Sequence, residues 1–339
     1  MPHRPIMLGV VGDSAAGKTT ISAGIARVLG LDRVTVICVD DYHRYNRDQR
    51  KALDITALHP ECNYIDIMEQ HVEALGRAEP ILKPVYNHGT GDFDPPVYVK
   101  PARFVIVEGL LGFHSERLRD CFHVKVYLDP PEEVRREWKI KRDTAKRGYT
   151  AEQVLGELDK RENDSAAFIR PQKKWADMVV RFYPPGAPRD DERLNVRLTL
   201  RPTMPQPDLE EIVSRSGCGA SALRLSVARD NGRLTEFLEI DGAVTSEQAQ
   251  AVEAALWAQQ PELRHMLPGE IGSFVDFVHG EQLRHSAPLG LTQLFIAHHM
   301  LRARLAKEQL LRQLQEQVAA AAQEQGDVAP APTSGGAAR

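Results

Sequence analysis

The sequence predicts an α/β protein with a doubly wound, mostly parallel sheet and a C-terminal half of mixed antiparallel strands and helices. Apolar runs of strand length alternate with helical patterns through the first half, as in parallel sheets buried on both faces. The five runs are IMLGVV (6–11), TVICV (35–39), FVIVEG (104–109), VKVYLD (124–129) and MVVRFYP (178–184). After a break rich in Pro, Gly and charge at 184–193, polar and apolar residues alternate instead, which is typical of antiparallel strands.

A glycine-rich loop follows the first run. Gly12, Gly17, Lys18 and Thr19 fit the spacing G-x-x-x-x-G-K-[ST]. In such a loop backbone N–H groups face phosphate oxygens, the lysine reaches the β and γ phosphates, and the threonine hydroxyl binds magnesium. We therefore expect a P-loop NTPase-like fold that uses ATP and Mg²⁺. The expected nucleotide-binding residues are Gly12, Asp13, Ser14, Ala15, Ala16, Gly17, Lys18, Thr19 and Thr20.

The surroundings of this loop support the motif. The run at 6–11 predicts a strand before it, and TISAGIARVLG (20–30) predicts a helix after it. Ile21, Ile25 and Val28 fall on one helical face, and Gly30 is a typical helix terminator. A fortuitous strand-to-helix turn is the alternative, and this context disfavours it.

Asp40 is the candidate general base. It directly follows the strand expected at 34–39, at the carboxyl edge of the sheet, where open α/β folds bind ligands. A hydroxyl that accepts a phosphoryl group must lose its proton, and a carboxylate at that edge can take it. The alternative is that Asp40 and Asp41 only cap the next helix.

Basic side chains beside Asp40 favour the functional alternative. They are His43, Arg44, Arg47 and Arg50. Such a cluster suits a substrate that already carries a phosphate. A solvated basic helix face remains the alternative for Arg44 and Arg50.

Two further segments belong to the expected site. Glu108 ends the third apolar run, and an acid at the tip of a strand is the second magnesium element of P-loop proteins. The stretch 82–101 is rich in turn formers and predicts a long loop or a short hairpin. Loops of that length inside a compact domain are commonly functional.

A charged helix is expected at 138–150. Its charged residues are Lys139, Lys141, Arg142, Asp143, Lys146 and Arg147. Helical spacing brings Lys139, Arg142 or Asp143, and Lys146 or Arg147 to neighbouring turns of one face. In P-loop kinases of small metabolites such a helix is a lid that brings cations onto the transferred phosphate. Lys141 and Lys146 are assigned to a solvated face instead.

The second half predicts a hairpin followed by helices. Asn231-Gly232 is a favoured two-residue turn, and Thr245 or Ser246 caps a helix. A long helix follows from 291, and the composition from 318 onward cannot sustain a core. We expect a kinase core with the ATP and acceptor sites at 1–185, a region that completes the fold and forms a dimer interface at 186–317, and a disordered tail at 318–339.

Composition limits the partners. The net charge of −4 and the pI near 6.3 argue against nucleic acid as a partner. No apolar run approaches the length of a membrane-spanning helix, and the N-terminus lacks a signal-peptide pattern, so we expect a cytoplasmic protein without membrane contact. The four cysteines have no metal-type spacing and are expected to be reduced thiols.

Taken together, these segments resemble the phosphoribulokinase family in its plant and cyanobacterial branch. The stretches that carry the resemblance are VVGDSAAGKTT, TVICVDDYHRYNR, KPVYNHGTGDFDPP, VIVEGLLGFH, WKIKRDTAKRGYT, FIRPQKKWADMVV, LEIDG and LGLTQLFIAHHMLRAR. The resemblance implies phosphorylation of ribulose 5-phosphate at its 1-hydroxyl by ATP, a Calvin-cycle reaction. The expected partners are ATP, ribulose 5-phosphate and a second copy of the chain, paired through the edge of the sheet.

The resemblance also implies roles for single residues. The expected catalytic residues are Lys18, Asp40, Arg142 and Asp143, and the expected magnesium ligands are Thr19, Glu108 and Asp143. The residues expected to line the sugar phosphate and the transferred group are His43, Arg47, Tyr86, His88, Lys139, Arg142 and Arg147.

Two positions depart from the family pattern. Plant-type members carry a P-loop cysteine that, as the resemblance implies, bonds with the strand-two cysteine. Here Ala16 replaces the first, while Cys38 keeps the second, so thiol regulation is not expected. Leu111 stands where the family signature has a histidine. A uridine kinase and a catalytically silent nucleotide-binding regulator are the competing functions.

Overall fold

Eight strands form one sheet in the order β2-β5-β1-β6-β7-β8-β10-β9. The parallel strands are β1 (Ile6–Gly12), β2 (Val34–Cys38), β5 (Phe104–Gly109), β6 (Val124–Leu128) and β7 (Met178–Tyr183). The antiparallel strands are β8 (Asn195–Leu200), β9 (Leu223–Asp230) and β10 (Arg233–Ile240). The predicted fold class is confirmed.

The computed structural model describes residues 4–186, 193–215, 222–260, 271–276 and 282–326. Two small antiparallel pairs accompany the main sheet, β3 (Ile81–Asn87) with β4 (Asp92–Val99) and β11 (Ser273–Asp276) with β12 (Gln282–His285). The α-helices are α1 (Lys18–Leu29), α2 (Arg47–Ala52), α3 (Ile65–Gly76), α4 (Glu116–Asp120), α5 (Glu132–Arg147), α6 (Ala151–Asp164), α7 (Leu209–Arg215), α9 (Ser246–Ala258) and α10 (Ala287–Gly326).

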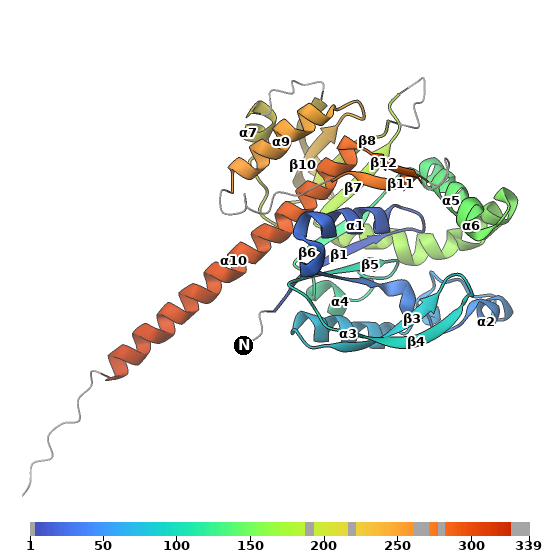
Figure 1. The fold of residues 1–339 in the computed structure, drawn as a ribbon, viewed down its shortest axis with the longest axis horizontal. Coiled ribbons are helices and arrows are strands. Elements are labelled where there is room, and N and C mark those ends of the chain that lie inside the picture. The colour runs from blue at the N-terminus through green and yellow to red at the C-terminus, as the bar shows by residue number, and fades with distance from the viewer. Residues whose placement is uncertain (1–3, 187–192, 216–221, 261–270, 277–281, 327–339) are drawn as a thin grey trace, which may run out of the picture. The chain divides into compact units, whose positions relative to one another are not determined.

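Helices cover both faces of the parallel strands, which explains their continuous apolar sequences. All seven residues of β1 are buried. In Figure 1 α1 lies above these strands, and α3 and α4 lie below them. Ile21, Ile25 and Val28 of α1 are buried, as their spacing predicted.

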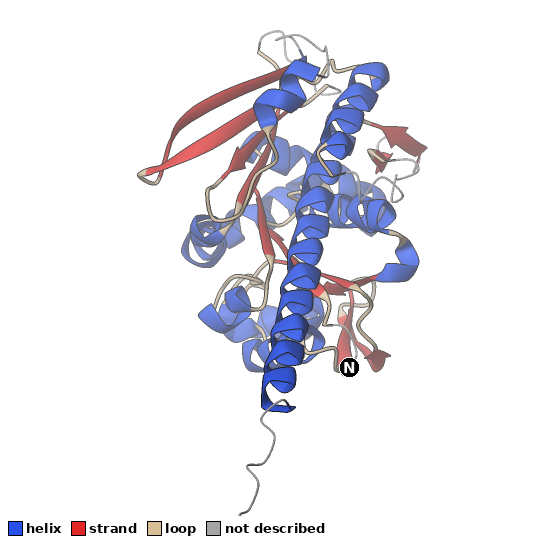
Figure 2. Ribbon diagram, turned by 90° about the vertical axis from the view of Figure 1, so that its left-hand side faces the viewer, coloured by secondary structure: helices blue, strands red, loops and turns tan. Residues whose placement is uncertain are grey.

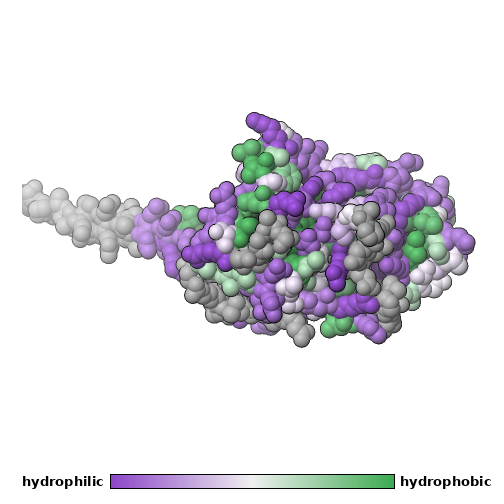
Figure 3. Space-filling model, turned by 90° about the horizontal axis from the view of Figure 1, so that it is seen from above, coloured by the Kyte–Doolittle hydropathy of each residue, from purple (hydrophilic) through white to green (hydrophobic). Residues whose placement is uncertain are grey.

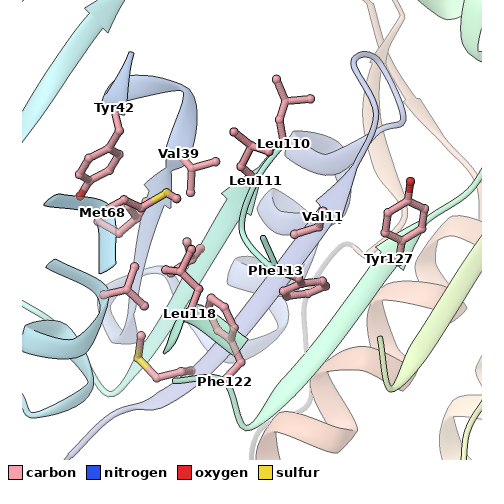
Figure 4. Packing of buried hydrophobic residues seen from close by; sticks show 14 of the residues in the cluster. Val11, Val39, Tyr42, Met68, Leu110, Leu111, Phe113, Leu118, Phe122 and Tyr127 are labelled. Carbon is pink, nitrogen blue, oxygen red and sulfur yellow. The ribbon is translucent and has the colours of Figure 1, made fainter. Parts of the chain in front are cut away.

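A cluster of buried hydrophobic residues fills the lower face (Figure 4). Met7 and Val11 of β1 belong to it, with Met68 of α3 and Leu118 of α4. Leu111, the position at which the sequence departs from the family, is 2% exposed and belongs to the same cluster. The residue therefore serves core packing here.

The stretch 82–101 forms a hairpin, one of the two alternatives that the sequence left open. β3 and β4 pair antiparallel, with an irregularity in register between Lys83 and Val85. Lys83 forms an ion pair with Asp41, which ties the hairpin to the segment after β2. The contact is tertiary, so local composition alone could not distinguish a hairpin from a loop.

The sheet continues past residue 185, where the sequence analysis placed a domain boundary. β8 pairs with β7, and β10 and β9 extend the sheet further. The turn between β9 and β10 is the predicted one, with left-handed backbone at Asn231 (φ 50°) and Gly232 (φ 80°). This ribbon is the long pair of strands at the upper left of Figure 2.

The chain divides into two compact units, Met1–Met300 and Leu301–Arg339. Residues 287–300 of α10 are buried within the first unit. In the second unit α10 runs to Gly326, so residues 318–326 of the predicted disordered tail are helical, in keeping with the helix propensity of Ala and Gln. Residues 327–339 lie outside the described part of the chain.

The surface in Figure 3 is mainly hydrophilic, with hydrophobic residues in separate patches. Among the described helices, none combines the length and the apolarity that crossing a bilayer requires.

Close packing against β1 gives the first prediction. A Cβ atom on Gly9 would lie 2.4 Å from Cε1 of Phe113 and 3.2 Å from Cδ2 of Phe122. Gly9→Ala should lower the free energy of unfolding by about 1–3 kcal/mol, measured by denaturant titration, because the core must shift to admit the methyl group. Gly76→Ala is the matched control, since nothing lies within 4 Å of its Cβ. Equal stability of Gly9→Ala and the wild type would contradict this packing.

Candidate active site

The loop between β1 and α1 is shaped to hold phosphate. Ala15 and Gly17 both adopt left-handed backbone, with φ of 63° and 92°. Lys18 is 9% exposed, and its ammonium donates hydrogen bonds to the carbonyl oxygens of Gly12 (2.9 Å) and Asp13 (2.8 Å). The two acceptors are carbonyl groups without net charge. The positive charge of Lys18 is therefore not neutralised by them and can attract a phosphate anion.

Thr19 and Glu108 form a pair that fits magnesium. The Thr19 hydroxyl donates a hydrogen bond of 2.9 Å to the carboxylate of Glu108, which lies near the end of β5. Burial raises the pKa of Glu108, and the charges of Asp40 and Asp41 raise it as well. The charge of Lys18 and the hydrogen bond from Thr19 act in the opposite direction. A divalent cation would offset this cost, and hydroxyl and carboxylate oxygens are ligands that Mg²⁺ prefers.

Few other protein ligands are at hand for such an ion. Among the described residues, no three or more His, Cys, Asp or Glu side chains form a cluster that could hold a metal. Mg²⁺ usually keeps several waters and binds through one or two protein groups plus substrate phosphates, so this set is compatible with it.

Asp40 and Asp41 differ in their surroundings although they are neighbours. Both belong to the short 3₁₀ turn Val39–Tyr42 that follows β2. The Asp41 carboxylate is bound by the Lys83 ammonium and by the backbone N–H of Tyr86. The half-buried Asp40 carboxylate makes no hydrogen bond or ion pair to the part of the chain that the structure describes. Asp41 therefore anchors the hairpin, and Asp40 is left available for chemistry.

His43 is a neutral side chain with a defined tautomer. Its Nδ1 lies 2.8 Å from the side-chain oxygen of Asn63, whose amide nitrogen donates to the carbonyls of Ala57 (3.1 Å) and His59 (2.9 Å). Those bonds fix the amide orientation, so Nδ1 carries the proton and Nε2 is the acceptor. Burial lowers the pKa of His43, although the negative charge of Asp40 acts to raise it.

Aromatic and cationic side chains lie next to His43. The Tyr86 ring lies 4.8 Å from the His43 ring and 5.0 Å from the His88 ring, measured between centroids. Arg50 donates a hydrogen bond of 2.6 Å to the Tyr86 hydroxyl and stacks over its ring. Arg47 donates to the His88 carbonyl (2.6 Å) and so ties α2 to the hairpin turn.

The second group of cations lies on α5. Lys139 and Arg142 contact the Asp143 carboxylate at 2.7 and 2.8 Å, and Lys139 and Asp143 are each 3% exposed. Although burial opposes ionisation, Arg142 and Lys139 hold the pKa of Asp143 below its usual range. Burial, together with Arg142 and Arg161, lowers the pKa of Lys139 to about 7. The side chain of Arg147, another expected site residue, lies outside the described atoms.

Arg161 of α6 is a candidate that sequence reasoning missed. Its charge acts on Lys139, and the charges of Arg161, Arg50 and Arg44 all lower the pKa of Cys62 against the larger effect of burial. Arg161 is therefore close enough to Lys139 and to Cys62 for its charge to act on both. The sequence offered no means to find it, because helix α6 reads as an ordinary charged helix.

The expected residues thus fall into three groups. Thr19, Lys18 and Glu108 meet at the P-loop, and Glu108 is coupled to Asp40. His43, Arg47, Tyr86 and His88 meet beside Asp40. Asp143, expected as a third magnesium ligand, forms ion pairs with Lys139 and Arg142, and its role toward the metal stays a prediction. In Figure 1 α5 and α6 lie above, and α2 and the hairpin lie below, the same right-hand side of the sheet.

This architecture defines a P-loop protein with a nucleotide loop and an acidic residue at the carboxyl edge of a parallel sheet. The chain belongs to the phosphoribulokinase/uridine kinase family, whose sequence model matches residues 7–186. Of the solved structures, the phosphoribulokinase from Rhodobacter spheroides covers 78% of this chain and 98% of its own, with a TM-score of 0.55 at 20% identity. This likeness shows a shared fold.

Curated relatives carry two different names. A phosphoribulokinase of Synechocystis sp. is 42% identical over 197 residues, which are 58% of this chain and 59% of that protein. The chloroplastic phosphoribulokinase of Arabidopsis thaliana is 38% identical over 216 residues, 58% of this chain and 55% of that protein. A uridine kinase of Lactiplantibacillus plantarum is 32% identical over 184 residues, 52% of this chain and 87% of that protein. The chain thus spans little more than half the length of these phosphoribulokinases.

The environment of Lys139 gives the second prediction. We expect its ammonium to titrate with a pKa of about 7, and Asp143→Asn to lower that pKa further, because the carboxylate favours the charged form. The measurement is an NMR titration of the lysine side-chain signals, with Lys139→Arg to assign the resonance. An Nζ that keeps its proton to pH 10 in the wild type would contradict the desolvated environment described here.

Proposed function

We propose that the chain phosphorylates ribulose 5-phosphate at its 1-hydroxyl with ATP, which makes ribulose 1,5-bisphosphate in the Calvin cycle. The P-loop residues 12–20 hold the triphosphate, with Lys18 at the β and γ phosphates. Thr19 and Glu108 hold Mg²⁺, which when bound neutralises charge on the transferred phosphate. The 42% identity to a phosphoribulokinase supports this reaction.

Asp40 is the general base in this proposal. Its carboxylate takes the proton of the acceptor hydroxyl as that oxygen attacks the γ phosphate. The lack of a hydrogen bond or ion pair to any described residue suits this role. Neutral His43, with Nε2 as acceptor, orients a sugar hydroxyl beside it. Arg142, held by Asp143, stabilises the charge that develops on the phosphate.

One observation carries the choice of acceptor: cationic side chains surround the residues beside Asp40. Arg50 and Arg47 contact Tyr86 and His88 of the hairpin, and Lys139 and Arg142 form a second cationic group on α5. A nucleoside acceptor carries no charge and needs none of these cations. An acceptor with its own phosphate is held by charge-assisted hydrogen bonds from them.

The alternative is nucleoside phosphorylation, favoured by the 87% of a uridine kinase's length that the chain matches. ATP consumption measured with ribulose 5-phosphate, with uridine and without acceptor distinguishes the two functions. We expect turnover with the sugar phosphate alone. Turnover with uridine alone would replace the proposal, and equal slow consumption in all three would indicate a silent nucleotide-binding protein.

We extend the proposal to assembly and location. Among the described strands β9 is the last of the sheet, and we propose that its outer edge pairs with β9 of a second copy. A homodimer formed in this way would act in the cytoplasm.

Asp40→Asn should lower turnover by about 10² to 10⁴-fold and leave ATP affinity nearly intact, because the base contributes to the chemical step. Asp41→Asn is the matched control, since Asp41 binds Lys83 and the Tyr86 N–H rather than the reacting groups. It should destabilise the hairpin with a much smaller loss of turnover. Steady-state kinetics and equilibrium ATP titration measure both. Near-normal turnover in Asp40→Asn would remove it as the base.

Activity should be insensitive to mild dithiol oxidants. The described cysteines Cys38, Cys62 and Cys121 are free thiols. Burial raises the pKa of Cys38, reinforced by Asp40 and Glu108, so the reactive thiolate is scarce. The test compares turnover after oxidised and reduced dithiothreitol, with thiol counting. Reversible loss of most activity with two thiols consumed per chain would overturn this expectation.

A further inference from the structure

The side chain of Asp13, the first residue after the leading P-loop glycine, connects the loop to two distant segments. Asp13 is 7% exposed, and its carboxylate accepts hydrogen bonds from the backbone N–H of Ser14 (2.6 Å) and from the Ser165 hydroxyl. The Arg135 guanidinium lies 3.6 Å away. Burying a carboxylate beside a site for anions costs free energy unless the carboxylate is paired and hydrogen-bonded, as Asp13 is here.

Its two partners belong to the helices that flank the P-loop. Arg135, 5% exposed, lies on α5 one turn before Lys139 and also donates to the Ser14 carbonyl (3.2 Å). Ser165, 1% exposed, begins the π-helical turn Ser165–Ile169 that follows α6. Such turns frequently occur at functional sites.

The same residue also holds the catalytic lysine. The Asp13 backbone carbonyl accepts a hydrogen bond of 2.8 Å from Lys18, while its carboxylate holds α5 and the end of α6. A shift of Asp13 would therefore move Lys18 relative to Lys139 and Arg142.

We propose that Asp13, Arg135 and Ser165 form a positioning contact that fixes the P-loop against α5 and α6 while the phosphoryl group is transferred. The kinetic consequence of this contact rests on the proposed function. Phosphoryl transfer requires the reacting groups to be aligned, and misplacing them by about 1 Å can lower the rate on the order of 10²-fold. Arg135 contacts Asp13 and the Ser14 carbonyl and is paired with Glu132 of its own helix. In this proposal it is a positioning residue and not a nucleotide ligand.

The test is a double-mutant cycle with Asp13→Asn, Arg135→Gln and the double variant. Arg136→Gln is the matched control, because Arg136 is the next residue of α5 and, like Arg135, pairs with Glu132, but its other partner is Asp159 rather than Asp13. Arg135→Lys tests rescue, since it keeps the charge. Each protein is measured for kcat, for the KM of ATP and for amide hydrogen exchange in residues 12–20 and 132–145.

We expect each single variant to lower kcat about 10 to 10²-fold with the KM of ATP within about twofold of the wild type. The double variant should lose less than the sum of the two single losses in free energy, because the contact between Asp13 and Arg135 is already broken in each single variant. Exchange in both segments should rise, and Arg135→Lys should recover part of the rate. Arg136→Gln should match the wild type.

Three outcomes would overturn the inference: additive losses, a rise in the KM of ATP at unchanged kcat, or unchanged exchange in both segments. The second outcome would make Arg135 a nucleotide ligand. The exchange measurement needs no acceptor, so it tests the contact even if the wild type fails to phosphorylate ribulose 5-phosphate. That failure would remove the proposed function and leave the contact itself to be judged by exchange.

Discussion

The turn that carries the chain from β1 into α1 constrains everything built around it. Left-handed backbone at Ala15 and Gly17 curls the loop, and the carbonyls of Gly12 and Asp13 hold Lys18 above it. Because β1 lies inside a parallel sheet, the ends of β2 and β5 reach the same edge. Glu108 and Asp40 therefore come to the loop through the order of the strands, which is set by the pairing of β5 with β1 and with β2.

The parts predicted correctly are those set by local sequence. The strand, the P-loop and α1 follow from apolar runs and glycine positions within 30 residues. The Asn231-Gly232 turn and the Thr245 cap with Gln248 also depend on neighbours in sequence. Leu111 shows the limit of a family pattern, because it stands at a signature position yet packs in the core.

The parts that sequence left open are decided by contacts between distant segments. Asp40 and Asp41 are neighbours in sequence, and the contacts from Lys83 and the Tyr86 N–H show that Asp41 is the one that anchors the hairpin. For Arg50 a solvated helix face was the alternative to the basic cluster, and it donates to the Tyr86 hydroxyl. Asp143 forms ion pairs with two cations of its own helix, which the sequence did not predict. Each of these contacts depends on which side chains the fold brings together. The periodicity of apolar residues in the sequence does not show this.

In the proposed function, the edge of the sheet is a site with two anion-binding ends. One holds the triphosphate, and the other holds a phosphate already on the acceptor. The most direct measurement is a ³¹P NMR spectrum of the products formed from ATP, Mg²⁺ and ribulose 5-phosphate. The account predicts ADP together with a sugar that carries two phosphate esters, at carbons 1 and 5. Inorganic phosphate in place of the second ester, with ribulose 5-phosphate unchanged, would contradict it.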